Sequence, residues 1–332
     1  MIEIDGSYGE GGGQILRTAV AMSMVTGTEI KINNIRANRP NPGLSHQHLK
    51  SLEAAVEISN GSAEGLKKSS KSVVFEPGDI EGGFYRFDIG TAGSVTLMLQ
   101  ALLPPAVISE KELTIELKGG TDVKWSPPYD YIENVFIKHL KNMDCDVNSK
   151  LIKRGHYPRG GGKIRVEISS GELIKPEYST EVSEIKGKVF VTDLPEHIME
   201  RMKKSVLKEF LEIPVSIKTE SHSSNSPGTG ITIWTEGGRV LGCGKLGEKG
   251  VPAEEIGKEA AETLKKFITN DVILDDWSAD QIVPFLSLVK DHDEMTVLEK
   301  TGHLETNIWV VNKFIKDSIS LERIDDHYLL KY

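Results

Sequence analysis

Gly9-Glu-Gly-Gly-Gly-Gln-Ile-Leu-Arg17 connects a strand-like start, Met1–Asp5, to an apolar run that predicts a helix as far as Val25. The strand-like segment Thr28–Ile32 follows. This order of glycine-rich loop, helix and strand recurs twice along the chain, which predicts a repeated architecture. The later copies are Gly90–Val95 with its helix before the strand Glu112–Glu116, and Ser278–Ile282 with its helix before the strand Glu294–Leu298.

A second helix is predicted in each repeat, after the strand and a polar loop, because apolar residues there recur with a period of about 3.6. These helices are expected at Leu49–Ile58, Tyr131–Leu140 and Thr306–Ile315. Paired strands close each repeat, and we expect Val73–Phe75 to pair with Gly83–Phe87. Coincidence among short helices and strands is the alternative, and the shared order of elements argues against it.

A stretch between the second and third repeats follows a pattern of its own. The helix starts move by about 80 positions from the first repeat to the second, but by about 180 from the second to the third. The excess falls at 181–274 and predicts a small α+β domain inserted in the third repeat, with 1–180 plus 275–332 forming a large domain. Its expected strands and helices are Lys186–Val191, Pro195–Phe210, Pro214–Thr219, Thr229–Thr235, Arg239–Gly244 and Ala253–Phe267.

Charge is unevenly divided between the two halves of the chain. The formal net charge is −9, with 20 Lys and Arg against 19 Asp and Glu in residues 1–166, and 20 against 30 in residues 167–332. This excludes a basic surface that coats nucleic acid non-specifically, but allows a local basic site in the first half. The arginines expected to form that site, in glycine- and proline-rich loops, are Arg17, Arg36, Arg39, Arg154 and Arg159.

Composition indicates a cytoplasmic protein without a membrane segment. A hydrophobic content of 38% suffices for a packed core and excludes disorder. Cys145 and Cys243 have no CxxC spacing, which predicts reduced thiols rather than a disulfide framework or a thiolate zinc site. No apolar run approaches the roughly 18 residues that span a bilayer. Met1–Asp5 lacks the features of a signal peptide.

Two motif matches are excluded by their expected context. Gly242-Cys-Gly-Lys-Leu-Gly247 fits GxGxxG, but a dinucleotide site needs a helix that starts at the third glycine, and here no helix begins before Pro252. His46 and His48 resemble a metal pair. Two positions apart in a predicted helix, their side chains point about 200° apart and do not share an ion.

The loop Gly9–Gln14 is a candidate phosphate site, because a loop that opens a helix presents backbone N–H groups and the positive helix end to an anion. Glu10 within it is unusual for a bare anion site and favours Mg²⁺ bridging to phosphate oxygens. Arg17, one helical turn beyond Gly13, is within reach of the same anion. The alternative is a tight turn that needs glycine for its positive φ angles.

Two further loops carry arginines, whose guanidinium groups match phosphate oxygens. Arg36 and Arg39 lie among prolines in Asn33–Gly43, and Arg159 lies in Gly155–Gly162. A solvated exposed loop and a glycine-rich hairpin are the respective alternatives, and the sequence leaves them open.

The stretch Thr301-Gly-His-Leu-Glu-Thr-Asn307 places His303 between a predicted strand and a predicted helix start, where a phosphate is favoured. Histidine is also a competent nucleophile toward phosphorus. The alternative is a surface or core histidine without a chemical role. Glu305, Thr306 and Asn307 are expected to cap the helix.

Together these stretches resemble the RNA 3′-terminal phosphate cyclases. The resemblance runs in order along almost the whole chain, so it is more specific than any single motif. It implies an α+β fold of three βαβαββ units forming a large domain, with a smaller α+β domain inserted in the third unit. The matching stretches are Gly9–Arg17, Arg36–Gly43, Asp88–Gln100, Gly119–Asp122, Tyr157–Gly162, Ala279–Gln281 and His303–Asn307.

The resemblance implies a reaction that consumes ATP and requires a divalent metal, Mg²⁺ or Mn²⁺. ATP adenylates a histidine, the AMP moves to an RNA 3′-phosphate, and the adjacent 2′-OH attacks to give a 2′,3′-cyclic phosphate. Adenylation supplies the leaving group that a terminal phosphate lacks, and proximity of the 2′-OH favours the last step. The implied partners are ATP and RNA ends, RNA being required over DNA; a homodimer is left open.

Carried onto this sequence, the resemblance makes His303 the nucleophile and Glu10 the metal-binding carboxylate. The residues implied to bind ATP are Gln100, Pro128, Trp277, Ser278, Ala279, Asp280 and Gln281. Trp277 offers a large face for stacking on adenine, with Pro127 or Pro128 as the opposite wall. The residues implied to bind triphosphate or RNA phosphate are Arg17, Arg36, Arg39, His48 and Arg159.

Two other functions stay open at this stage. The family includes ribosome-biogenesis proteins that bind rRNA and lack the catalytic histidine, so the presence of His303 favours an enzyme. An enolpyruvyl-transferase-like enzyme would share the repeat architecture and bind small anionic metabolites without an adenylated histidine. Lys203, Lys204 and Lys208 of the inserted segment are a candidate RNA contact that the sequence does not decide.

Overall fold

The first repeat forms a small mixed sheet with two helices. The computed structural model describes residues 1–169 and 171–332. Strands β1 and β2 are parallel, and the other pairs are antiparallel, in the order β1-β2-β4-β3. The elements are β1 (Ile2–Asp5), α1 (Gly13–Thr26), β2 (Ile30–Asn33), α2 (His46–Ile58), β3 (Ser62–Glu64) and β4 (Val73–Glu76).

The second repeat has the same topology, with the strand order β5-β6-β8-β7 and a parallel first pair. Its second helix is interrupted by a π-helical turn at Ile132–Phe136. The elements are β5 (Gly83–Asp88), α3 (Val95–Ile108), β6 (Leu113–Gly119), α4 (Tyr129–Tyr131), α5 (Ile137–Asn142), β7 (Asp146–Lys153) and β8 (Gly162–Ser169).

The third repeat is abbreviated at its first strand, where Leu274 forms a single parallel bridge to Val297. The following sheet has the order β13-β15-β14, which matches the last three strands of the other repeats. The elements are α8 (Asp276–Leu286), β13 (Glu294–Val297), α9 (Gly302–Phe314), β14 (Ser320–Ile324) and β15 (His327–Lys331). The α+β fold of repeated βαβαββ units is therefore confirmed.

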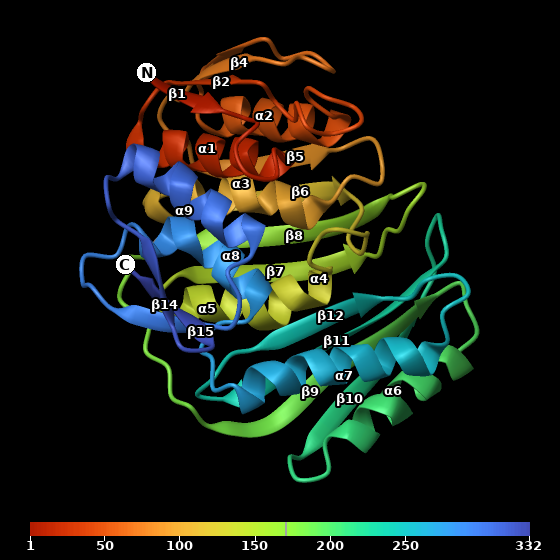
Figure 1. The fold of residues 1–332 in the computed structure, drawn as a ribbon. Helices are drawn as coiled ribbons and strands as arrows, with labels where there is room; N and C mark the ends of the chain where they lie inside the picture. The colour runs from red at the N-terminus through yellow and green to blue at the C-terminus, as the bar shows by residue number, and fades with distance from the viewer. Residues whose placement is uncertain (170) are drawn as a thin grey trace.

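Between β8 and the bridge at Leu274 the chain forms a further sheet with the order β10-β9-β11-β12. Helices α6 and α7 pack side by side on one face of this sheet (Figure 1) and enclose a separate hydrophobic core. The elements are β9 (Val182–Thr192), α6 (His197–Glu209), β10 (Val215–His222), β11 (Gly228–Gly237), β12 (Gly242–Leu246) and α7 (Ala253–Thr269). Each lies close to its predicted position.

One predicted strand pairing is wrong. Val73–Phe75 pairs with β2 and β3 of its own repeat, whereas Gly83–Phe87 lies in β5 and pairs in parallel with β6. Alternating apolar residues identify both segments as strands but carry no information about the partner, because either neighbour buries the same face. The segment assigned to the end of the first repeat therefore begins the second.

Helix α1 lies at the centre of the large domain. Every residue from Gln14 to Met24 is buried, and the helix packs against α2, α3 and α9. A helix that is buried on all sides fits an interior position. Its N-terminus, and with it the loop Gly9–Gln14, therefore lies where the first and third repeats meet. Among the described residues, no helix is long and apolar enough to cross a membrane.

Candidate active site

His303 lies in the first turn of α9, which begins at Gly302 rather than at the predicted Thr306. Thr301 caps the helix, its hydroxyl accepting a 2.9 Å hydrogen bond from the backbone N–H of Leu304. The expected capping by Glu305, Thr306 and Asn307 is wrong, since the helix starts earlier and Thr301 caps it, leaving those three residues inside the helix. The earlier start fixes the backbone of His303 in the helix.

Carboxylates lie beside both ring nitrogens of His303. Its Nδ1 is 3.5 Å from Oδ2 of Asp280, and its Nε2 is 3.6 Å from Oε2 of Glu10. The Asp280 side chain is 12% exposed, whereas those of His303 and Glu10 are half exposed. Burial raises the pKa of Asp280, and hydrogen bonds from His303 and Thr301 oppose that rise. The hydrogen bond from Thr301 holds the Asp280 carboxyl group in place, and Glu10 is open to solvent and ligands.

Polar contacts from α1 hold this arrangement in place. Gln14 donates a 2.9 Å hydrogen bond from its amide to the carbonyl of His303. The Thr18 hydroxyl donates a 2.6 Å hydrogen bond to Oδ1 of Asn307, and the Asn307 amide donates a hydrogen bond to the carbonyl of Asp280. Asn307 therefore joins α1, α8 and α9 instead of capping a helix.

Arg17 and His48 are both buried in one corner of the site, and only Arg17 carries a charge. Arg17 donates a 3.2 Å hydrogen bond to Oε1 of Gln100, and burial lowers its pKa to about 10, so it remains charged at neutral pH. Burial, followed by repulsion from Arg17 and Arg36, lowers the pKa of His48 to about 3. His48 is consequently neutral, and its ring lies so close to Gly13 that a Cβ there would be 2.0 Å from Nε2.

Arg36 and Arg39 approach the same region from the loop after β2. Arg36 donates 2.9 Å to the carbonyl of Gly43, which keeps its loop closed. Arg39 lies 3.4 Å from Oε2 of Glu10, with both side chains about half exposed. An exposed pair of this kind is weak and exchanges readily for another charged ligand.

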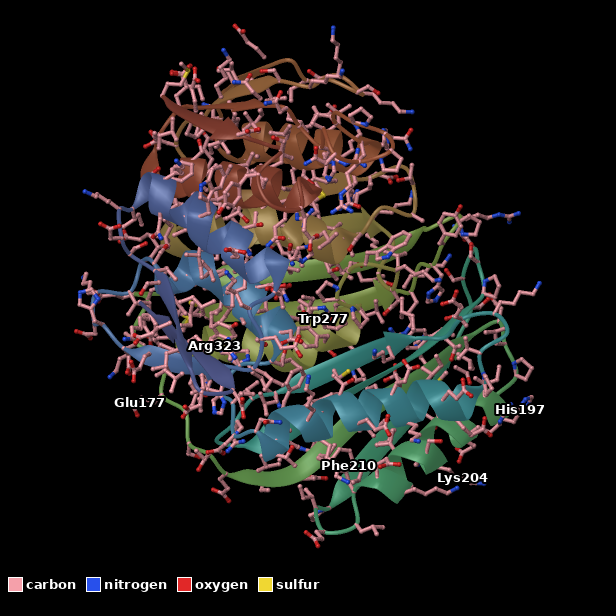
Figure 2. All side chains as sticks on the ribbon, in the orientation of Figure 1. Glu177, His197, Lys204, Phe210, Trp277 and Arg323 are labelled. Carbon is pink, nitrogen blue, oxygen red and sulfur yellow. The ribbon has the colours of Figure 1, made fainter. Side chains whose placement is uncertain are left out.

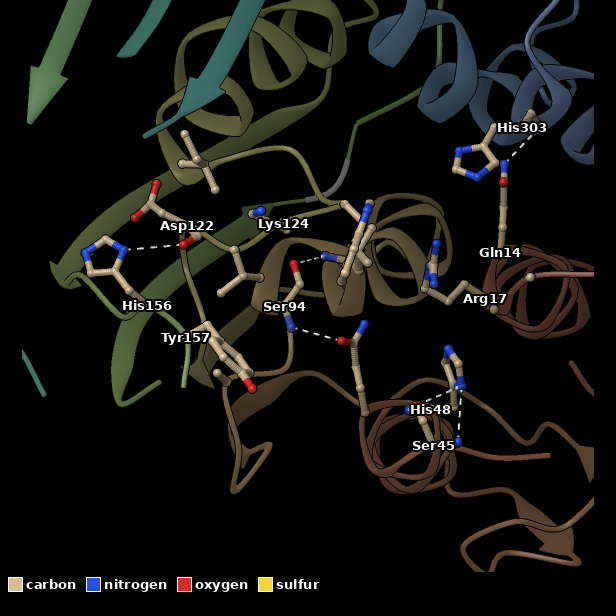
Figure 3. Close-up of a pocket in the computed structure, with 18 of the residues that line it drawn as sticks. Gln14, Arg17, Ser45, His48, Ser94, Asp122, Lys124, His156, Tyr157 and His303 are labelled. Carbon is tan, nitrogen blue, oxygen red and sulfur yellow. Dashed lines mark hydrogen bonds between the residues drawn. The ribbon is translucent and has the colours of Figure 1, made fainter. Parts of the chain in front are cut away.

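Two cavities meet at His303. The larger has a volume of about 860 Å³ and contains the cationic groups (Figure 3). The smaller has a volume of about 70 Å³ and lies against α8. Five residues line both cavities: Gln14, Arg17, Leu97, Trp125 and His303. Of the predicted phosphate-binding set, Arg17, Arg36, Arg39 and His48 line the larger cavity, as does Glu10, the predicted metal ligand.

The predicted ATP-binding residues differ in whether they line a cavity. Gln100, Trp277, Asp280 and Gln281 line the smaller cavity. Ser278 and Ala279 are buried instead, and the Ser278 hydroxyl contacts Tyr131 and Asp275. They face the core because α8 turns about 100° per residue.

Of the two prolines offered as the wall opposite Trp277, one lines the smaller cavity. Pro127 lines the smaller cavity, whereas Pro128 packs beside Gly244, where a Cβ would lie 2.6 Å from its Cγ. Trp277 also approaches Gly244 and stands edge-on to Tyr131, with ring centroids 4.9 Å apart. Because Gly244 has no side chain, it leaves the space that Pro128 and Trp277 occupy.

Two expected arginines lie apart from this cluster. Arg159 is exposed and is not among the residues that line either cavity. Arg154 is fully buried, 2.7 Å from Asp130 and 3.2 Å from Asp122, so the expectation that it contributes to an open basic site is wrong. Its charge is already balanced, because a buried guanidinium requires partners.

Several cavity residues were not singled out from the sequence. Gln14 belongs to the motif Gly9–Arg17, but its hydrogen bond goes to the carbonyl of His303, which lies 289 positions away in the sequence. Trp125, Tyr157 and His156 line the larger cavity. The sequence gives one signal for Trp125, its position as an aromatic residue between Gly119–Asp122 and Tyr157–Gly162, two of the stretches that resemble the family. The dismissal of GxGxxG is supported, since β12 is antiparallel to β11 and α7 begins at Ala253.

Comparison with known proteins agrees with this architecture. A family model described as RNA 3′-terminal phosphate cyclase matches residues 8–321. Proteins named RNA 3′-terminal phosphate cyclase are similar over nearly their whole length. That of Methanopyrus kandleri is 45% identical over 97% of this chain and 95% of its own. That of Pyrococcus furiosus is 46% identical over 95% of this chain and 93% of its own. That of Archaeoglobus fulgidus is 44% identical over 97% of this chain and 98% of its own.

The fold and site define a three-repeat α+β protein with a half-exposed histidine where two cavities meet. The chain belongs to the RNA 3′-terminal phosphate cyclase family. The family predicted from the sequence, and with it the enzyme class, is confirmed.

Proposed function

We propose that this chain converts an RNA 3′-terminal phosphate to a 2′,3′-cyclic phosphodiester with ATP, through a covalent adenylate on His303. The observation that carries this is the position of His303, between Asp280 and Glu10 at the junction of two cavities. Membership of the cyclase family supports the reaction class. A histidine with one cavity for a nucleotide and another for a phosphate end suits a relay of AMP between them.

In the first step, Nε2 of His303 attacks the α-phosphorus of ATP, the N–P bond forms, and the P–O bond to pyrophosphate breaks. Asp280 accepts a hydrogen bond from Nδ1–H, which leaves the lone pair on Nε2. The same carboxylate stabilises the positive charge that develops on the ring. Trp277 and Gln100 in the smaller cavity are the proposed contacts for the nucleoside.

In the second step, an oxygen of the RNA 3′-phosphate attacks the adenylate phosphorus, and the N–P bond breaks to return His303. In the third, the ribose 2′-oxygen attacks the 3′-phosphorus, AMP leaves, and the hydroxyl proton is released. Arg17, Arg36 and Arg39 line the larger cavity and are suited to hold the phosphates. Their fixed positions reduce the entropy cost of the cyclisation.

A divalent ion fits beside Glu10 with limited help from the protein. The described residues contain no group of three or more His, Cys, Asp and Glu side chains arranged to hold a metal. The half-exposed Glu10 carboxylate would be its protein ligand, with nucleotide phosphates and water supplying the rest, as Mg²⁺ commonly accepts. When bound, such an ion neutralises charge on the phosphate oxygens.

The test is incubation with α-labelled ATP and Mg²⁺, followed by analysis of the protein and of a 3′-phosphorylated oligoribonucleotide. Wild-type protein is expected to form an acid-labile, base-stable adduct and a cyclic RNA end, with no cyclisation of the matched DNA. His303→Ala abolishes both, whereas His197→Ala, on the outer helix α6 (Figure 2), serves as the matched histidine control. An equal adduct in His303→Ala contradicts the proposal, and rRNA binding without any adduct would favour a non-catalytic relative.

A further inference from the structure

Part of the larger cavity lies beyond the groups that the proposed function uses. That end is lined by Lys124, His156 and Tyr157 of the second repeat, and by 227–229 and 246–247 of the neighbouring sheet domain, while Trp125 lines both this cavity and the smaller one. Tyr157 and His156 lie across the cavity from His303, with Ser94 and Arg17 between them (Figure 3). The cavity is continuous from His303 to these residues, so a ligand held at one end reaches the other.

Two large aromatic side chains that line the larger cavity are open to solvent. Trp125 is 93% exposed and Tyr157 is 78% exposed, so neither contributes its surface to a core. Trp125 also has a φ of 63°, an uncommon conformation for a bulky residue. Exposed aromatic side chains inside a cavity are typical of a binding surface rather than of a folding requirement.

The opposite wall is held firmly against the second repeat. The guanidinium of Arg154 lies 3.8 Å from the ring centroid of Phe190 in β9, and His156 is 2.9 Å from the hydroxyl of Thr192. Gly228 leaves room for this contact, since a Cβ there would lie 2.4 Å from Cγ of His156. The two walls are thereby fixed at one separation.

Charge at this end is already balanced. Lys124 lies 2.8 Å from Glu248, with both side chains about half exposed. An exposed pair of this kind is weak, so Lys124 stays available to a phosphate, and the two aromatic faces are the feature suited to a base. Aromatic faces of this kind stack on the bases of single-stranded nucleic acid with little regard to sequence, because every base has a flat π surface.

We infer that Trp125 and Tyr157 form a stacking subsite for the RNA nucleotides that precede the 3′-terminal one. This rests on the proposed function, which places the terminal phosphate at the other end of the same cavity. The subsite explains a role for the inserted domain, whose residues 227–229 and 246–247 complete its wall. The lysines Lys203, Lys204 and Lys208 lie on α6, and Lys204 is on the outer side of the domain (Figure 2), away from this subsite.

The test compares ligands that do and do not reach the subsite. Binding of a short 3′-phosphorylated oligoribonucleotide is measured without ATP, beside the same RNA abasic at its penultimate position and uridine 3′-monophosphate. Tyr157→Ala is expected to raise the Kd for the intact RNA about tenfold, and that for the monophosphate by less than about twofold. Tyr157→Phe, which keeps the ring, retains tight binding. Leu211→Ala, at an exposed leucine (86%) remote from the cavity lining, is the matched surface control.

Two comparisons make the proposal falsifiable. If Tyr157 stacks on the penultimate base, the losses from Tyr157→Ala and from the abasic RNA are not additive, and additive losses overturn the proposal. Equal losses for RNA and monophosphate also overturn it. If Trp125→Ala weakens ATP binding and leaves RNA binding intact, Trp125 belongs to the nucleotide site and the subsite proposed from both side chains is overturned. Failure of cyclisation alone, with the binding pattern preserved, refutes the proposed function and not the subsite.

Discussion

The carboxylate of Asp280 lies 3.5 Å from Nδ1 of His303 and accepts a 2.6 Å hydrogen bond from Thr301. Asp280 comes from α8, and both other residues come from the start of α9, so the packing of two successive helices sets the orientation of the imidazole. In the proposed reaction, an acceptor at Nδ1 keeps the proton there and leaves the lone pair of Nε2 for the attack on phosphorus. The sequence comparison implied only ATP binding for Asp280.

Asp280→Asn is therefore expected to slow formation of the His303 adenylate by about 100-fold or more, because an amide also donates and permits the wrong tautomer. Single-turnover labelling with α-labelled ATP measures this rate. The matched control is Glu305→Gln, which removes a carboxylate two residues from His303 that is paired with Lys300 instead. Equal adenylation rates in the wild type and in Asp280→Asn would mean that the contact with Asp280 does not select the tautomer of His303.

Asp276 makes stability depend on pH. Burial, with Asp275 as the next cause, raises the pKa of Asp276 to about 7, and its Oδ1 is buried without a hydrogen-bond partner among the described residues. The pKa of Asp276 in the folded protein lies above the ordinary 3.8. The contribution of this carboxyl group to the free energy of unfolding is therefore complete below pH 3.8 and is lost as the pH rises through about 7. Asp276→Asn should raise the free energy of unfolding by about 2 kcal/mol near pH 8 and by little near pH 4.

Thermal unfolding of Asp276→Asn at these two pH values tests this dependence. Asp146→Asn, at an exposed position of β7, is the matched control. A stabilisation of the same size at both pH values would mean that the Asp276 proton is not its source.

Gly13 is required by its contact with His48. A Cβ at Gly13 would lie 2.0 Å from Nε2 of His48, so Gly13→Ala displaces the ring and is expected to cost about 1–3 kcal/mol of stability. The double variant Gly13→Ala, His48→Ala removes the overlap and should recover part of this loss in chemical denaturation. If the double variant loses as much stability as the two single variants together, the overlap between a Cβ at position 13 and the His48 ring is not the cause of the loss in Gly13→Ala.

Arg36 and Arg39 are expected to hold phosphate groups in the larger cavity. Replacing either by Ala should raise the KM for a 3′-phosphorylated RNA or for ATP by about tenfold or more, since a charged hydrogen bond contributes roughly 1.5–3 kcal/mol. Steady-state kinetics with each substrate in turn assigns each arginine. Arg159→Ala is the matched comparison, because its exposed side chain lies outside both cavities and should change either KM less than twofold. Unchanged kinetics for Arg36 and Arg39 would make them bystanders.

Much of the fold was predictable because local patterns are sufficient to identify elements. The six elements expected at 181–274 all appear, since each has a distinct apolar period and a turn on either side. Partners of strands were harder to predict, as β5 shows by pairing with β6 instead of β4. The start of α9 was missed because its capping residue, Thr301, precedes the apolar pattern.

The sequence by itself determined the repeated order of helices and strands, the family, and the residues able to carry the chemistry, because these depend on local pattern and residue type. Only the tertiary structure decided which of them meet. It buried Arg154 among carboxylates, turned Ser278 and Ala279 into the core, and set Asp280 and Glu10 beside the two nitrogens of His303. Contacts between residues nearly 300 positions apart, such as Gln14 with His303, arise from helix packing, which no local pattern specifies.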